Sequence, residues 1–207
     1  VIKKSTGSGS NGVLLADNKE KLIKKAKKAF NTYQWKYVLI ENLLLLKKVF
    51  TNKGKFKTEK LHRQKAIFQN FIPFLEGDFK VLIYFDKYYI FERPNKKNDF
   101  RASGSGTSKY LYGTDANIPD GIFDYSKKIY DKLNVPNLSL DIAYSKETFY
   151  LIEFQGISFG TIGQFSSEEF FIKTDEKKWI PIKERIELEN LFAQSIDKYI
   201  KKDHAKK

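Results

Sequence analysis

Residues 138–155, LSLDIAYSKETFYLIEFQ, predict the β-hairpin from which the fold can be inferred. Apolar side chains alternate with other residues in both halves, at Leu138, Leu140 and Ile142 and again at Tyr150, Ile152 and Phe154. A two-residue period is typical of a strand with one buried face. The connecting segment Tyr144–Thr148 is polar and as short as a hairpin loop should be. The sequence therefore predicts two antiparallel strands.

Three oxygen-bearing side chains are expected to converge on this hairpin. On its second strand, Leu151, Glu153 and Gln155 should share one face. If the strands pair antiparallel, Asp141 stands across from Glu153 and Gln155. Two carboxylates and an amide oxygen are the ligands that Mg²⁺ takes beside phosphates. The alternative, which any one of these residues alone would favour, is an acidic face exposed to solvent.

The start of the chain predicts a phosphate-binding loop. Val1–Lys4 and Val13–Ala16 are expected strands, and Ser5–Gly12 between them is rich in Gly and Ser. Such a tip lets backbone N–H groups approach phosphate oxygens. It is not a Walker A loop, because Val13 stands where that motif needs Lys. A flexible hairpin tip is the alternative. Together with Lys3 and the distal carboxylates, the loop favours a nucleotide–Mg²⁺ site.

Several short motifs occur in a fixed order over residues 1 to about 160. They are Ile2-Lys3, the loop Gly7–Gly12, Gln69–Ile72, Gly77–Lys80, Asn98–Ser103, Asp141-Ile142 and Glu153–Gln155. In this order they resemble the ATP-grasp superfamily, especially its ribosomal-protein glutamate ligases and, more distantly, its D-alanine–D-alanine ligases. The resemblance implies an α+β fold in which two lobes enclose ATP. The expected lid lobe is 1–68, and the expected core lobe is 69–207.

The resemblance also implies a role for each matching residue. The ATP contacts would be Lys3 on the α/β phosphates, the loop residues Gly7, Ser8, Gly9, Ser10 and Gly12 on the β/γ phosphates, Gln69, Asn70, Phe71 and Ile72 on adenine, and Asp78 on the ribose. The metal ligands for Mg²⁺ or Mn²⁺ would be Asp141, Glu153 and Gln155. Arg101 would face the transferred phosphoryl group, for which a planar guanidinium is well suited.

The expected activity is ATP-dependent ligation of a small-molecule or peptide carboxylate to an amine or thiol, through an acyl phosphate. An ATP-grasp kinase and a non-catalytic nucleotide- or polyanion-binding module are the alternatives. Three positions depart from the family patterns: Gln155 replaces the usual Asn, Asp78-Phe79-Lys80 replaces Asp-x-Arg, and Ser139 stands where the D-alanine ligases have Arg, which argues against D-alanine ligation. Family enzymes carry a further domain before this point. Since the chain begins with Val and contains no Met, it is expected to be part of a longer polypeptide.

The amino-acid composition is compatible with the expected two-lobed fold. The 207 residues, 41% of them hydrophobic, suffice for one sizeable core or two lobes. The net charge is +13, but the lysines are spread around helix faces, so no nucleic-acid partner is expected, although an anionic partner stays open. The absence of Cys excludes disulfides and thiol catalysis. No apolar run is long enough to span a membrane, and a cytoplasmic setting is expected.

The remaining pattern predicts elements along the chain. Expected helices cover about 18–33, 118–133 and 183–201, and expected strands cover about 65–72, 78–85 and 88–93. The segment 95–114, rich in Gly, Ser, Asn and Lys, is expected to be an active-site loop.

Overall fold

The computed structural model describes residues 1–4, 12–30, 39, 42–43, 46, 66–95, 110–156 and 159–204. The chain divides into two compact units, Val1–Phe71 and Ile72–Lys207. The lobes expected from the sequence divide it close to the same point. Both helices and antiparallel sheets occur, so the fold is mixed α+β.

The first unit contains a small antiparallel sheet and one helix. The strands β1 (Ile2–Lys4), β2 (Val13–Leu14) and β3 (Ala66–Phe68) are ordered β2-β1-β3. Ile2 pairs with both Leu14 and Phe68 and is fully buried. Helix α1 (Lys19–Phe30) is preceded by Asn18, whose side-chain oxygen accepts a hydrogen bond from the Lys21 backbone N–H at 2.8 Å. This is an N-cap, which satisfies one of the free N–H groups of the first turn.

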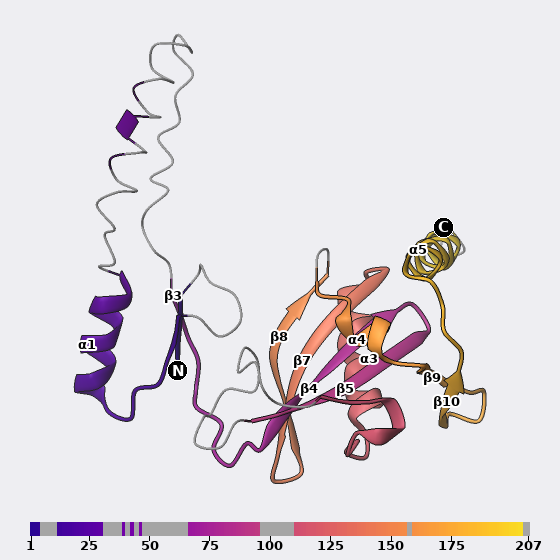
Figure 1. Cartoon of the computed structure of the whole chain (residues 1–207), viewed down its shortest axis with the longest axis horizontal. Helices are drawn as coiled ribbons and strands as arrows, with labels where there is room; N and C mark the ends of the chain where they lie inside the picture. The colour runs from indigo at the N-terminus through magenta and orange to yellow at the C-terminus, as the bar shows by residue number, and fades with distance from the viewer. Residues whose placement is uncertain are drawn as a thin grey trace. The chain divides into compact units, whose positions relative to one another are not determined.

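The second unit is built on a seven-stranded sheet. Its main order is β10-β9-β5-β4-β7-β8, and β6 pairs with β5. The strand bounds are β4 Gly77–Tyr84, β5 Lys87–Pro94, β6 Leu111–Tyr112, β7 Asn137–Ser145, β8 Thr148–Gln155, β9 Glu169–Lys173 and β10 Trp179–Lys183. Figure 1 shows β8, β7, β4 and β5 side by side. All pairings are antiparallel.

The predicted hairpin is formed by β7 and β8. Its turn is Lys146-Glu147, and both residues have positive φ, 48° and 58°. Two residues in this conformation match the right-handed twist of the flanking strands, as type I′ turns do. Ser145 pairs with Thr148, so the loop is shorter than Tyr144–Thr148.

The sheet has two faces, each with its own hydrophobic core. Helix α3 (Ile122–Leu133) covers one face. Its core consists of Phe79, Val81, Ile83, Tyr88, Ile90, Ile122, Phe123, Tyr130, Leu138, Leu140, Ile142 and Phe171. The opposite core consists of Leu82, Tyr84, Tyr89, Phe91, Phe170, Ile186 and Leu191, the last from helix α5 (Leu188–His204). Because side chains alternate along a strand, consecutive residues of β4 enter different cores.

A β-bulge in β8 corrects one expectation about the hairpin. Asp141 pairs with Glu153, whereas the next residue, Ile142, pairs with Leu151, so Ile152 is the extra residue. A bulge interrupts the two-residue alternation. Leu151 consequently packs on the α3 side of the sheet, and Glu153 lies opposite Asp141 on the other side. The prediction that Leu151 shares a face with Glu153 is therefore wrong.

Other element boundaries also differ from the prediction. Helix α3 begins at Ile122, after Gly121, whose φ of 85° ends the preceding turn. The hairpin β9–β10 was not predicted, and helix α5 begins at Leu188 rather than near Lys183. Residues 179–183 pair with β9. The spacing of apolar residues within one segment does not show with which other strand it pairs. A short helix, α4 (Ile162–Ser166), lies between the β7–β8 and β9–β10 hairpins. Within the described residues, no helix combines the length and apolarity needed to cross a membrane.

Candidate functional site

A group of charged residues crosses three neighbouring strands, β5, β4 and β7, on the face opposite α3. We call Asp78, Lys80, Arg93 and Asp141 the charged cluster. The strand register builds it, because Asp78 pairs with Arg93 and Lys80 pairs with Asp141. Directly opposite side chains in an antiparallel sheet lie close enough to interact. Glu153, opposite Asp141 on β8, continues the row.

Arg93 is the centre of the charged cluster. Its Nε donates to Asp78 Oδ1 at 2.6 Å, and a terminal nitrogen donates to Asp78 Oδ2 at 2.8 Å. The same nitrogen lies 3.0 Å from Asp141 Oδ2. Lys80 Nζ donates to Asp141 Oδ1 at 2.6 Å. Two carboxylates and two cations therefore form one network in which every charge has a partner.

The cluster is largely removed from solvent. The side chain of Arg93 is 7% exposed, and that of Asp141 is 16% exposed. Burial disfavours a charged group unless it is paired and hydrogen-bonded. The four residues satisfy this condition together, since removal of any one leaves an uncompensated charge.

The two carboxyl groups respond differently to this environment. Burial raises the pKa of Asp78 above its usual value, against the lowering effect of the Arg93 charge. Burial also acts to raise the pKa of Asp141, but the charges of Arg93 and Lys80 outweigh it, so that pKa is lowered. Asp141 has two cations beside it, whereas the side chain of Asp78 is hydrogen-bonded, among the residues that the structure describes, to Arg93 alone. The pKa of Arg93 is raised, because Asp78 and Asp141 overcome the lowering effect of burial.

Glu153, which is exposed, and Gln155, which is half-buried, form the edge of the site on β8. Gln155 Nε2 donates to Glu153 Oε1 at 2.9 Å. Gln155 pairs with Ser139, so its side chain lies on the same face as Asp141. The prediction that Asp141, Glu153 and Gln155 converge on one face is thus matched by the register.

The residues at this edge offer a donor set suited to a hard cation. Among the described residues, no group of three or more His, Cys, Asp or Glu side chains is arranged to hold a metal ion. Asp141 and Glu153 supply two carboxylates, and Gln155 adds an amide oxygen. Each carboxylate oxygen of Asp141 has two lone pairs, so a bond from Lys80 or Arg93 leaves capacity for a second interaction. Oxygen ligands of this kind fit Mg²⁺ or Mn²⁺.

The other predicted ATP contacts fall in different parts of the chain. Lys3 lies in β1 opposite Val13 and Ile67, and Gly12 precedes β2 with a φ of 88°. The Gln69 backbone N–H donates to the Val1 carbonyl at 2.9 Å, which extends the pairing of β1 with β3. Gln69, Asn70 and Phe71 end the first unit, and Ile72 begins the second. Gly7, Ser8, Gly9, Ser10 and Arg101 lie outside the described residues.

Arg93 is the site residue that the sequence prediction missed. The turn between β4 and β5 is Phe85-Asp86, so residues equally distant from it lie opposite each other. This symmetry places Arg93 beside Asp78. The signal in the sequence was a pair of expected strands joined by a short turn, which predicts which residues lie opposite each other.

Neither a scan against family models nor a search of curated proteins finds a match to the chain. The site is therefore defined by its own residues and geometry.

Proposed function

We propose that the protein is an ATP-dependent ligase of the ATP-grasp type, which joins a carboxylate to an amine or thiol with Mg²⁺ or Mn²⁺. The main supporting observation is the direct opposition of Asp141 and Glu153 on β7 and β8, with the Gln155 amide beside Glu153. A mixed α+β architecture with an antiparallel sheet is compatible with this class.

In this proposal, Asp141, Glu153 and Gln155 hold the metal ion, which neutralises charge on the ATP phosphates. Lys80 and Arg93 position Asp141 through the ion pairs described above. Both oxygens of Asp78 accept hydrogen bonds from Arg93, so Asp78 positions Arg93 in addition to the ribose contact that the family resemblance implies.

The proposed reaction has two steps. A substrate carboxylate oxygen attacks the γ-phosphorus of ATP, the bond to the β–γ bridging oxygen breaks, and ADP leaves. An amine or thiol then attacks the acyl carbon of the acyl phosphate, loses a proton and displaces inorganic phosphate. No protein nucleophile is required, because catalysis depends on positioning and on electrostatic stabilisation. Arg101, Lys3 and the loop from Gly7 to Gly12 are proposed phosphate contacts.

A second candidate is a nucleotide-binding module without catalytic activity. It is favoured by one observation, namely that Asp141 is already paired with both Lys80 and Arg93. A carboxylate that is neutralised in this way attracts a divalent cation less strongly than a free one.

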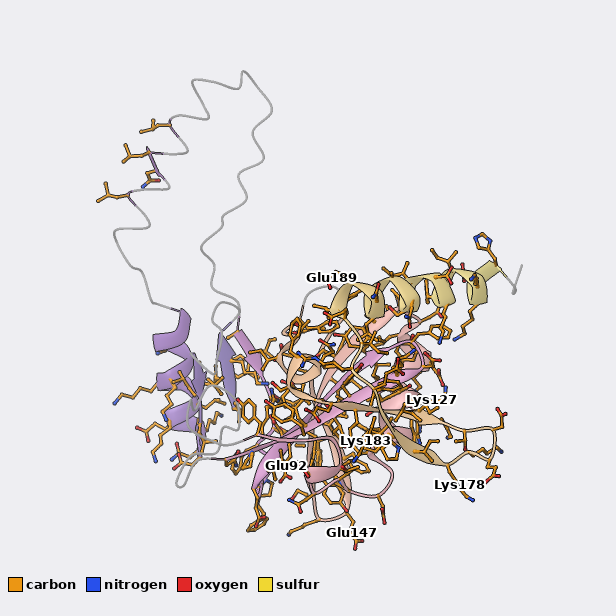
Figure 2. All side chains as sticks on the ribbon, turned by 45° about the vertical axis from the view of Figure 1, so that its right-hand side comes forward. Glu92, Lys127, Glu147, Lys178, Lys183 and Glu189 are labelled. Carbon is orange, nitrogen blue, oxygen red and sulfur yellow. The ribbon has the colours of Figure 1, made fainter. Side chains whose placement is uncertain are left out.

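The decisive experiment compares Glu153→Gln with Glu147→Gln in the full chain. Both residues belong to the β7–β8 hairpin, but Glu147 lies in its exposed turn (Figure 2). Calorimetric titration with ATP in the presence and absence of Mg²⁺ measures binding. Phosphate release against a panel of carboxylates paired with amines or thiols measures turnover.

We expect Glu153→Gln to weaken Mg²⁺-dependent ATP binding by at least about tenfold, equivalent to about 1.4 kcal/mol, and to abolish turnover. Glu147→Gln should leave both unchanged. Undiminished Mg²⁺-dependent binding in Glu153→Gln would contradict the metal assignment. Binding of ATP by the wild type without turnover on any substrate pair would support the non-catalytic module instead.

A further inference from the structure

A second candidate site lies in the same unit, at a cavity that the proposed function does not use. The cavity has a volume of about 580 Å³ and is open to solvent. Its wall combines residues from the turn after β6, the start of β9 and the end of β10. Ligand pockets in proteins commonly measure about 300–1,000 Å³, so a small molecule fits this volume.

Glu169 is the buried acid of this cavity. Its residue surface is only 7% exposed. One carboxylate oxygen, Oε1, accepts a hydrogen bond from the Thr114 backbone N–H. The other, Oε2, is buried and has no hydrogen-bond partner among the described residues. A buried carboxylate oxygen without a donor is costly, and such an exception in a folded protein calls for a specific explanation.

The backbone around Glu169 is shaped to accommodate its carboxylate. Gly113 has a φ of +55°, and a Cβ added there would lie 2.2 Å from Glu169 Oε1. Only glycine provides both the left-handed conformation and the space. The carboxylate is thereby held in place between Gly113 and the Thr114 N–H, with Oε2 left to accept another donor.

Two unpaired cations line the same cavity. Lys183 and Arg185 are exposed residues of its wall (Lys183 is labelled in Figure 2). Neither forms an ion pair with any residue that the structure describes. Lys183 is the last residue of β10, and Arg185 lies two residues further along the chain. The wall also carries the acidic residues Asp115, Glu168 and Glu184. Besides these, the cavity offers a buried acceptor at Glu169 and two cations without an ion pair.

We propose that this cavity binds a small zwitterion of the α-amino acid class. The ammonium group of the ligand donates to Glu169 Oε2, and its carboxylate is held by Lys183 and Arg185. An ammonium supplies the donor and the charge that the buried carboxylate lacks. The proposal is independent of the ATP site, because it uses none of the residues of the charged cluster.

The test begins with the full chain and no nucleotide. The common L-α-amino acids are screened individually by saturation-transfer NMR at millimolar concentration. The amino acid that binds most tightly is then compared with its amide, which lacks the carboxylate, and with its deaminated acid, which lacks the ammonium. We expect both analogues to bind at least about tenfold more weakly than the amino acid. If no amino acid binds, or if either analogue binds equally well, the proposal is wrong.

Variants then assign each end of the ligand. Glu169→Gln keeps the shape and the acceptor for Thr114 but removes the charge, and it should reduce affinity at least about tenfold. In Arg185→Gln and Lys183→Gln, the affinity for the amino acid should fall toward the affinity for its amide. The affinity for the amide itself should change little. Lys178→Gln, in the exposed turn of the same β9–β10 hairpin (Figure 2), is the matched control.

The test can be interpreted even if one variant fails to fold. Arg185 and Lys183 are exposed, so their variants should fold even if Glu169→Gln does not. Glu169→Gln should itself be at least as thermally stable as the wild type without ligand, because it removes an unpaired buried charge. Unchanged amino-acid affinity in Arg185→Gln and Lys183→Gln together would overturn the carboxylate assignment. Unchanged affinity in a folded Glu169→Gln variant would overturn the ammonium assignment.

Discussion

Arg93 donates two hydrogen bonds to the carboxylate of Asp78, with nitrogen–oxygen distances of 2.6 and 2.8 Å. The two residues stand opposite each other on β4 and β5, so the strand register itself brings them together. The same guanidinium reaches Asp141 on β7. One side chain thus connects three strands on the face of the sheet opposite α3.

This geometry predicts that Arg93→Lys is destabilising although it conserves the charge. An ammonium cannot reproduce two parallel hydrogen bonds to Asp78 and a third contact to Asp141. We expect the free energy of unfolding to fall by about 2 kcal/mol, the scale of a hydrogen bond to a charged group, as measured by urea denaturation. The control is Lys127→Ala, which removes an exposed ion pair with Asp131 (Lys127 is labelled in Figure 2). It should cost less than about 0.5 kcal/mol, and equal losses would contradict the central role of Arg93.

Asp141→Asn should make stability less dependent on pH in the acid range. The pKa of Asp141 is lowered below 3.8 in the folded protein, so the unfolded chain binds a proton more readily than the folded one. The contribution of the carboxylate is therefore complete above pH 3.8 and lost as pH falls through the lowered folded pKa. At pH 7 we expect the variant to lose about 3 kcal/mol, the scale of breaking a buried pair.

Urea denaturation of both proteins between neutral pH and pH 3 measures this difference. It should shrink on acidification below pH 3.8, the unperturbed value for the carboxyl group. A difference that stays constant over this range would show that Asp141 does not stabilise the fold through its charge.

Gly163 in α4 is predicted to tolerate no side chain. A Cβ at this position would lie 2.0 Å from Cε1 of the Phe91 ring. Gly163→Ala should therefore lower the free energy of unfolding by about 1–3 kcal/mol, as overpacking does. Gly160→Ala is the matched control, since an added Cβ there meets nothing within 4 Å. Thermal or urea unfolding of the two variants distinguishes this packing effect from a general effect of replacing glycine.

The metal role proposed for Gln155 predicts opposite outcomes for two substitutions. Gln155→Asn keeps the amide oxygen and should retain Mg²⁺-dependent ATP binding. Gln155→Leu removes the oxygen and should weaken that binding by about tenfold, the scale found for lost metal-site interactions. Calorimetric titration with Mg²⁺ and ATP checks both. Equal behaviour of the two variants would remove Gln155 from the proposed ligands.

Local pattern predicted much of the second unit. The alternation in residues 138–155 was sufficient for the β7–β8 hairpin, because a strand with one buried face repeats every two residues. The same pattern predicted that Asp141 stands across from Glu153, which the register confirms. The helix ending at Leu133 and the strands β4 and β5 were also found in this way. These features depend on residues that are close together in the sequence.

Tertiary structure decided what local pattern does not encode. The bulge at Ile152 inverted the alternation in β8, so Leu151 entered the core while Glu153 faced away from it. The β9–β10 hairpin was not predicted from the sequence. Edge strands gain their stability from pairing with a neighbour, and periodicity in a single segment does not show which neighbour is available.

By itself the sequence determined the hairpin and the acidic pair that it presents. Only the tertiary structure decided that Asp141 is neutralised by Lys80 and Arg93, which come from two other strands. The physical reason is that cross-strand contacts form at positions set by register, and the register of distant strands depends on how both faces of the sheet pack. Burial then requires these charges to be paired, because one unpaired buried charge would destabilise the fold more than the complete network of Asp78, Lys80, Arg93 and Asp141 does.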